Sequence, residues 1–258
     1  MKYKKIITSG CSFTEGLTWS EYLNNHLDKN NINVNFSNVS LRAQGNDLIQ
    51  KKAIYAIRHA MDYEKFKPEE IAVFIMWSGT ERRGLYIDNP DLVDKILRKE
   101  QHRHTGMNPF LALDNTRKSD SGWLLTNSLG SGNDIINLDF YRLSLSDSHS
   151  AHYSLENILH LQYFCKLFNI KLYEMFYMSY VSEIIEKEAD HPIVNYMYRD
   201  YDKSNLINPS IFEYLKDRER ETGTELFRFD QHPNSLGQRI YFENIVLTKL
   251  TEQGFFKD

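Results

Sequence analysis

Apolar and polar positions along the chain follow two periods, one typical of buried strands and one typical of amphipathic helices. Short continuous apolar runs, many of them β-branched, predict strands covered on both faces. These strands span residues 4–10, 32–40, 70–78 and 170–178. Recurrence of apolar residues every three or four positions predicts helices between and after them. These helices span residues 18–27, 47–63, 154–169 and 235–250.

Two stretches interrupt this alternation and are predicted to be insertions. Residues 84–150 are polar and rich in Asn, Ser, Asp and Gly, with a basic helix-like segment at 90–104. Residues 179–225 hold two short helical patterns, and the segment 224–230 that follows fits a strand or a loop. The sequence therefore predicts a single α/β domain over 1–258, a three-layer α/β/α sandwich around a parallel sheet. Ligands in such folds bind at the carboxyl ends of the strands.

Composition and charge narrow the function classes. The 258 residues are 41% hydrophobic and 26% charged, with a net charge of -4, which argues against a nucleic-acid binder. No run approaches the ~20 apolar residues of a membrane span, and "MKYKKII" is too short for the apolar region of a signal peptide. Cys11 and Cys165 fit two reduced thiols. We therefore expect a cytoplasmic protein that binds neither nucleic acid nor membrane.

The end of the first strand and the start of the last helix carry candidate chemistry. In "SGCSFTEG", Gly10 allows a sharp turn that presents Ser12 at the end of the sheet. A serine nucleophile needs a histidine base held by a carboxylate, and "FDQHPN" offers Asp230 and His232 just before the last helix. Two plain interpretations stay open, since Ser12 can simply cap the backbone and "DQHPN" can be a capping loop. A Cys11 thiolate nucleophile is a further alternative to a small buried cysteine.

These motifs, in the order Ser…Asp…His, resemble the SGNH (GDSL-like) hydrolase family. "SGCSFTEG" is similar to the block that carries the nucleophile, "RAQGND" to the block whose glycine N–H enters the oxyanion hole, and "DQHPNSLG" to the block of the acid and the histidine. The resemblance implies a flavodoxin-like fold and a catalytic triad of Ser12, His232 and Asp230. It also implies that the N–H groups of Ser12 and Gly45 stabilise the oxyanion.

The chain departs from the family pattern at three positions. Cys11 replaces the aspartate beside the serine, and a "GCSFT" start looks like a divergent branch common among phage-encoded members, which leaves association with a virion open as an alternative location. Asp230 stands two positions before His232, whereas the acid of the family commonly stands three positions before the histidine. The segment "MWSGTERRG" lacks the asparagine that normally completes the oxyanion hole, and loss of one such donor costs ~2.7–4 kcal/mol in barrier.

Side chains at the ends of the second and third strands are candidates to replace that asparagine or to bind substrate. Ser78 and Thr80 offer hydroxyl donors for the oxyanion. Asn46, Trp77 and Arg82 are candidate substrate-binding residues, and Arg82 would also supply a cation.

Other motifs compete with these candidates. Asp190–His191 is a second Asp–His pair, and Asn133 in "GSGND" would be an oxyanion donor if a strand preceded it. His102 and His104 in "HRH" lack the partners of a zinc site, and no nucleotide-binding glycine loop is present, so we expect no metal and no cofactor.

The predicted function is that of a serine esterase or deacylase acting on a small O-acyl substrate, with esters of carbohydrates included. Two alternatives use the same fold. An O-acyltransferase would pass the acyl group from the same intermediate to an alcohol, and a non-catalytic binding or assembly module would have lost turnover. The missing asparagine favours the module.

Overall fold

The computed structural model describes residues 1–42, 44–80, 82, 84–87, 91, 110–111, 122–125 and 146–257. Seven β-strands lie within these residues, and the three short ones at 84–125 are described by their backbone alone. The strands are β1 (Lys5–Gly10), β2 (Asn35–Asn38), β3 (Ile71–Trp77), β4 (Gly84–Ile87), β5 (Phe110–Leu111), β6 (Gly122–Leu125) and β7 (Lys171–Phe176).

Most helices of the described residues follow the predicted periodic segments within a few residues, but the one predicted to begin at Ser154 begins at Asp147, inside the stretch predicted to be an insertion. They are α1 (Trp19–Lys29), α2 (Asn46–Asp62), α5 (Asp147–Leu167), α6 (Ser179–Lys187), α7 (Pro192–Tyr198), α8 (Ile211–Thr222), α9 (Ser235–Tyr241) and α10 (Leu247–Glu252). A short 3₁₀ helix, η1 (Pro68–Glu70), precedes β3, and one π-helical turn, η3 (Phe242–Val246), joins α9 to α10.

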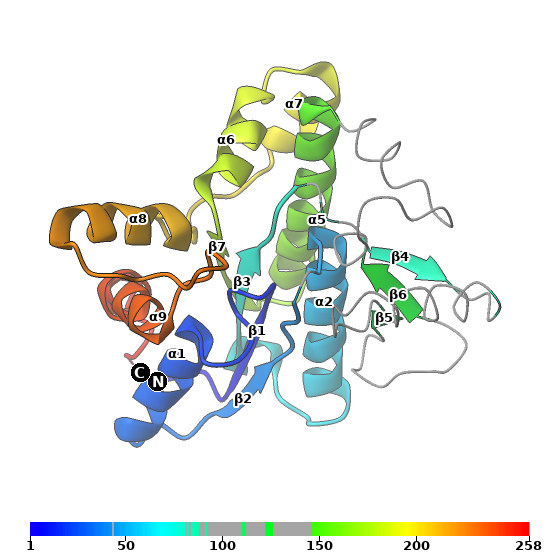
Figure 1. Cartoon of the computed structure of the whole chain (residues 1–258). Helices are drawn as coiled ribbons and strands as arrows, with labels where there is room; N and C mark the ends of the chain where they lie inside the picture. The colour runs from blue at the N-terminus through cyan, green and yellow to red at the C-terminus, as the bar shows by residue number, and fades with distance from the viewer. Residues whose placement is uncertain are drawn as a thin grey trace.

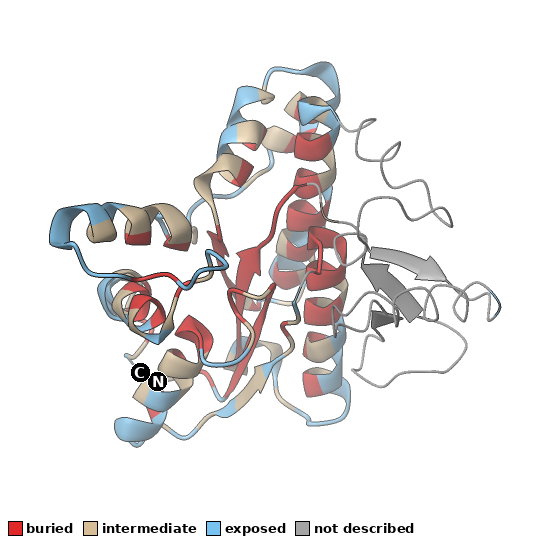
Figure 2. Cartoon of the chain, viewed as in Figure 1, coloured by how far each residue is buried: buried red, intermediate tan, exposed pale blue. Residues whose placement is uncertain are grey.

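A four-stranded parallel sheet with helices on both faces confirms the predicted α/β three-layer architecture. The strand order is β2-β1-β3-β7, and β1 runs in register with β3 from Lys5 opposite Ile71 to Gly10 opposite Met76. Helices α2 and α5 cover one face, and α1 and α9 cover the other (Figure 1). Every residue of β1 and β3 is buried, which explains their continuous apolar sequence (Figure 2).

The first predicted insertion contains a second, smaller sheet. Its strands are antiparallel in the order β4-β6-β5, with Gly84 opposite Leu125 and Phe110 opposite Leu124. The sequence showed no strand pattern there, because strands of two to four residues are too short to display a period. The helix-like segment 90–104 lies outside the described residues except for Asp91.

Two local expectations were wrong: the three-residue spacing of Thr18 and Glu21 predicts a capping box for the first helix, and the last helix was predicted to be continuous. The Thr18 side chain does not cap α1; its hydroxyl donates to Thr14 O at 2.9 Å, and Gln238 Oε1 accepts the Trp19 N–H at 3.0 Å instead. The final helix is not one continuous α-helix, since the π turn interrupts it. The segment 224–230, which fitted a strand or a loop, makes only an isolated bridge between Phe227 and Pro233.

Across the part of the chain that the structure describes, the longest apolar helical windows fall short of what a bilayer crossing needs.

Candidate active site

Ser12 lies in a tight turn directly after the central strand β1. Thr14 N–H and Glu15 N–H both donate to Cys11 O, at 2.9 and 3.2 Å, so the chain turns helically at the end of the sheet. Gly10 permits the turn, because a Cβ there would overlap the Thr14 side chain and lie 3.1 Å from Met76 O. The turn leaves Ser12 partly exposed and buries Cys11 completely. Cys11 therefore belongs to the core in this structure.

His232 is carried by a short loop held at both ends. Arg228 N–H donates to His232 O at 2.8 Å, and Gln231 takes a positive φ of 62° to close the turn between them. Asn234 then caps α9, since its Oδ1 accepts the Gly237 N–H at 2.9 Å. Asn234 is thus the helix cap that the sequence allowed, and the His232 side chain takes no part in capping α9.

The structure brings Ser12 and His232 into hydrogen-bond contact. Ser12 Oγ lies 2.8 Å from His232 Nε2, across 220 residues of sequence. The Phe13 ring packs beside the imidazole, with centroids 5.0 Å apart, and Tyr177 packs edge-on against Phe13 at 5.1 Å. A serine hydroxyl and an imidazole nitrogen at this distance have the geometry of a nucleophile and its general base.

Asp230 contacts the other side of the imidazole. Its Oδ2 lies 3.4 Å from His232 Nδ1, and its Oδ1 accepts the His232 backbone N–H at 3.1 Å. Partial burial acts to raise the pKa of the Asp230 carboxyl, but the His232 N–H, the His232 ring and Arg228 outweigh it and leave the pKa below its ordinary value. Asp230 O also lies 3.3 Å from Nδ1, so both the carboxylate and the backbone carbonyl can orient the ring.

A cavity of about 440 Å³ opens above this pair. Three predicted site residues line it, namely Ser12, Asp230 and His232. Most of the remaining lining is polar or charged, and Leu17 and Pro233 are its apolar members. The other lining residues are Glu15, Gly16, Thr18, Arg42, Arg228, Asn234, Ser235 and Gln238.

Gly45 lies outside the lining of this cavity. It is the N-cap of α2, at the positive end of that helix. Its neighbour Gln44 donates through Nε2 to Gly10 O, and Leu41 N–H donates to the same oxygen at 3.3 Å. The loop after β2 is thereby fastened to the end of β1, two residues before Ser12.

Asn46 was predicted to bind substrate, but it does not line the cavity. Its side chain is fully buried, with Oδ1 accepting the Ser78 N–H at 2.7 Å and Nδ2 donating to Ser78 O at 3.3 Å. This double contact joins the first residue of α2 to the residue after β3. Asn46 therefore fixes the backbone beneath the site.

Trp77 is likewise buried, and its Nε1 donates to Glu174 Oε1 at 2.8 Å within the sheet layer, away from the cavity.

The two predicted hydroxyl donors are also buried. Ser78 is fully buried and its Oγ accepts from Arg82 Nη1 at 3.0 Å, while Thr80 is 3% exposed. Arg82 is partly buried, and its guanidinium lies 5.5 Å from the centroid of the Tyr177 ring. Ser78 and Tyr177 thus orient Arg82 on the same side of the sheet end as Phe13.

The competing motifs are placed elsewhere or lie outside the described residues. His191 caps the short helix α7, and no contact between it and Asp190 is among those of the described side chains. Asn133, His102 and His104 lie outside the described residues. Within the described ranges, no three His, Cys, Asp or Glu side chains converge as metal ligands would.

Sequence reasoning missed the charged side chains around the cavity. Glu15 accepts from Arg42, and Arg228 lies 3.5 Å from the predicted Asp230. Glu15, Arg42 and Arg228 all line the cavity. Glu15 stands three residues after Ser12, a spacing that puts both on one side of a helical turn, and this was the available signal. No signal in the sequence pairs Glu15 with Arg42, which lies 27 residues away.

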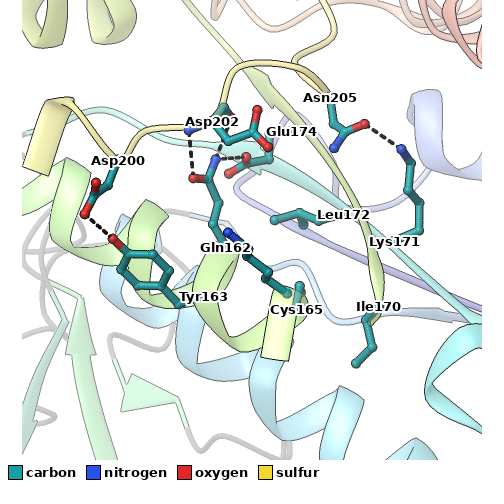
Figure 3. A pocket seen from close by; sticks show the side chains of 11 residues that line it. Gln162, Tyr163, Cys165, Ile170, Lys171, Leu172, Glu174, Asp200, Asp202 and Asn205 are labelled. Carbon is teal, nitrogen blue, oxygen red and sulfur yellow. Dashed lines mark hydrogen bonds between the residues drawn. The ribbon is translucent and has the colours of Figure 1, made fainter. Parts of the chain in front are cut away.

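A second cavity, of about 290 Å³, is lined by residues of the edge strand β7 and the end of α5 (Figure 3). It shares no lining residue with the cavity at Ser12. The buried Glu174 carboxylate accepts from Gln162 Nε2 at 2.6 Å and from Trp77 Nε1 at 2.8 Å. Tyr163 donates to Asp200, and Lys171 donates to Asn205, both at 2.6 Å. Because these polar groups bind one another, the second cavity offers less for a reaction than the first.

Comparisons with known proteins give structural similarity without sequence similarity. No protein-family model matches the chain, and no curated protein matches it. The structure is similar to that of the psychrotrophic esterase EstA from Pseudoalteromonas sp., solved with monoethylphosphonate as inhibitor, at 12% identity and a TM-score of 0.49 over 97% of this chain and 98% of that one. It is also similar to TesA, at 15% identity and a TM-score of 0.41 over 95% and 97% of the two chains. The likeness is distant, and the function below is argued from the geometry around Ser12.

Proposed function

We propose that this protein is a serine esterase or deacylase of the SGNH type that cleaves small O-acyl esters. The observation that carries the proposal is the 2.8 Å contact between Ser12 Oγ and His232 Nε2 at the mouth of a cavity of about 440 Å³. The cavity lies at the carboxyl ends of the parallel strands, where α/β proteins bind their ligands. The mainly polar lining favours a short acyl group and a polar alcohol over a long lipid chain.

The first half of the reaction uses Ser12 and His232. Ser12 Oγ attacks the acyl carbonyl carbon while His232 Nε2 takes the hydroxyl proton, and the carbonyl oxygen becomes an oxyanion. The bond to the alcohol then breaks, and His232 returns the proton to the leaving oxygen. Asp230 stabilises the imidazolium through Nδ1 in both steps.

The second half regenerates the enzyme. Water gives a proton to His232 and attacks the acyl carbon, and the bond to Ser12 Oγ breaks as the proton returns to the serine. The products are the free acid and the free enzyme.

The oxyanion would be stabilised by the N–H groups of Ser12 and Gly45, with Arg82 replacing the missing asparagine. Neither backbone N–H has an acceptor among the described residues. The Ser78 hydroxyl is already bound to Arg82, which makes the guanidinium the better third donor. Preorganised donors of this kind are worth about 2.7–4 kcal/mol each in barrier.

The test is hydrolysis of p-nitrophenyl acetate together with labelling by a fluorophosphonate. We expect wild-type protein to hydrolyse the ester and to take up the label, and Ser12→Ala to lose both. Ser182→Ala, in α6 outside the cavity, is the matched control and should behave as wild type. Equal hydrolysis by wild type and Ser12→Ala, with no labelling of either, would instead identify a non-catalytic module.

A further inference from the structure

Glu15 follows Ser12 in the same turn, and both residues line the cavity. The turn is closed by the bonds of Thr14 N–H and Glu15 N–H to Cys11 O. Glu15 therefore moves with Ser12 as part of one rigid unit at the end of β1.

The Glu15 carboxylate binds the backbone of the neighbouring loop, which distinguishes it from an ordinary surface ion pair. Its Oε2 accepts the Arg42 backbone N–H at 3.1 Å and the Arg42 Nε at 3.0 Å. The Arg42 side chain is 70% exposed, so the ion pair itself contributes little to stability. What the contact supplies is a fixed position for the Arg42 backbone.

Arg42 belongs to the short loop that leads to Gly45. Leu41 N–H and Gln44 Nε2 attach this loop to the end of β1 through Gly10 O, which precedes the turn. The start of the loop is tied to the turn by Asn38, whose Nδ2 donates to Thr14 O at 2.9 Å and whose Oδ1 accepts the Ser40 N–H at 3.0 Å. The bond from Glu15 joins the turn to Arg42, which is closer in sequence to Gly45.

A buried cation of α2 also lies near Glu15. Lys52 is 1% exposed, and burial lowers its pKa to about 8 while the attraction of Glu15 acts in the opposite direction. Glu15 thus lies within electrostatic reach of the loop before α2 and of the helix itself.

We propose that Glu15 is a positioning residue that sets the distance between the Ser12 N–H and the Gly45 N–H. This role rests on the proposed function. Two donors must converge on one oxygen, and small displacements of groups that act on the transition state weaken catalysis strongly. Glu15 touches neither the reacting atoms nor the imidazole, and it acts through the Arg42 backbone.

The experiment compares three substitutions of Glu15 by steady-state kinetics on p-nitrophenyl acetate. Glu15→Ala removes the acceptor and should lower kcat roughly 10- to 100-fold with KM nearly unchanged. Glu15→Asp keeps the charge but draws the oxygens back from Arg42, and should lose a similar part of kcat. Glu15→Gln keeps an acceptor oxygen at the same reach and should recover most of it. Glu21→Ala, in the first turn of α1, is the control and should match wild type.

The order of kcat identifies the cause. Wild type above Glu15→Gln, with Glu15→Asp and Glu15→Ala lowest, supports positioning through the hydrogen bond. Glu15→Asp near wild type with Glu15→Gln as poor as Glu15→Ala overturns it, because charge would then be what matters. Ser12-dependent hydrolysis that Glu15→Ala leaves unchanged also overturns it and spares the proposed function. Wild-type protein without Ser12-dependent hydrolysis overturns both.

Discussion

Asp230 holds His232 by two atoms at once, through the backbone N–H at 3.1 Å and toward the ring Nδ1 at 3.4 Å. The carboxylate is 39% exposed, and the Asp230 carbonyl oxygen lies equally near Nδ1, at 3.3 Å. The Asp230 carboxylate is therefore partly exposed to solvent, and the Asp230 backbone carbonyl orients the imidazole together with it.

The first prediction follows from the orientation of the ring by both the carboxylate and the backbone carbonyl of Asp230. His232→Ala should lower kcat on the order of 10²–10⁴-fold, because it removes the general base. Asp230→Ala should cost less than about tenfold, since an exposed ion pair contributes about 0–1 kcal/mol. Initial rates on p-nitrophenyl acetate compare the two, and equal losses would show that the carboxylate alone orients the ring.

The second prediction concerns Asn46, which binds both backbone groups of Ser78. Asn46→Ala leaves a buried N–H and a buried C=O without partners and should destabilise the fold by about 1–3 kcal/mol for each group. Asn46→Asp keeps the acceptor for the N–H but turns a second oxygen toward Ser78 O, so it should not restore stability. Urea unfolding measures both changes, and wild-type stability of Asn46→Asp would contradict the bidentate contact.

The third prediction concerns the turn before Ser12. Gly10→Ala would overlap the Thr14 side chain and should cost about 1–3 kcal/mol and reduce fluorophosphonate labelling of Ser12. Gly223, the C-cap of α8 outside the cavity, is the matched control, because no atom lies within 4 Å of its would-be Cβ although its φ is 68°. Gly223→Ala should be strained by about 1–2 kcal/mol and retain labelling. Thermal melts measure the loss of stability in both variants. Labelling rates show whether only the overlap at Gly10 also displaces Ser12.

The fourth prediction is a pH dependence of stability from Glu174. Burial raises the pKa of its carboxyl to about 7, against the hydrogen bonds from Gln162 and Trp77, from an ordinary value of 4.5. Between these two pH values the folded state binds the proton and the unfolded state does not, so the contribution of Glu174 to stability falls as pH rises from about 4.5 to about 7 and then levels off.

Glu174→Gln removes the titrating carboxyl and should flatten the dependence of the free energy of unfolding on pH between about 4.5 and about 7. The measurement is the free energy of unfolding at several pH values between 4.5 and 8 for both proteins. An identical slope in the two would show that Glu174 titrates normally. Glu70→Gln is the control, since Glu70 lies at the protein surface with its pKa lowered by Lys4 rather than raised by burial.

Much of the fold could be read from the sequence because its determinants are local. Burial on both faces of β1 and β3 makes their sequences continuously apolar, and the helices between them repeat their apolar positions at helical spacing. The positions of Ser12, Asp230 and His232 were also readable, since each stands where a buried element ends or begins.

What only the tertiary structure decided are the contacts between distant segments. The sequence placed Asn46 and Trp77 at strand ends, but their amide and indole groups turn inward to Ser78 and Glu174. It did not reveal that Glu15 binds the Arg42 backbone, because a backbone donor has no residue type to recognise. Local periodicity determines which segments are buried, whereas the partner of each buried polar group depends on how those segments come to lie together in space.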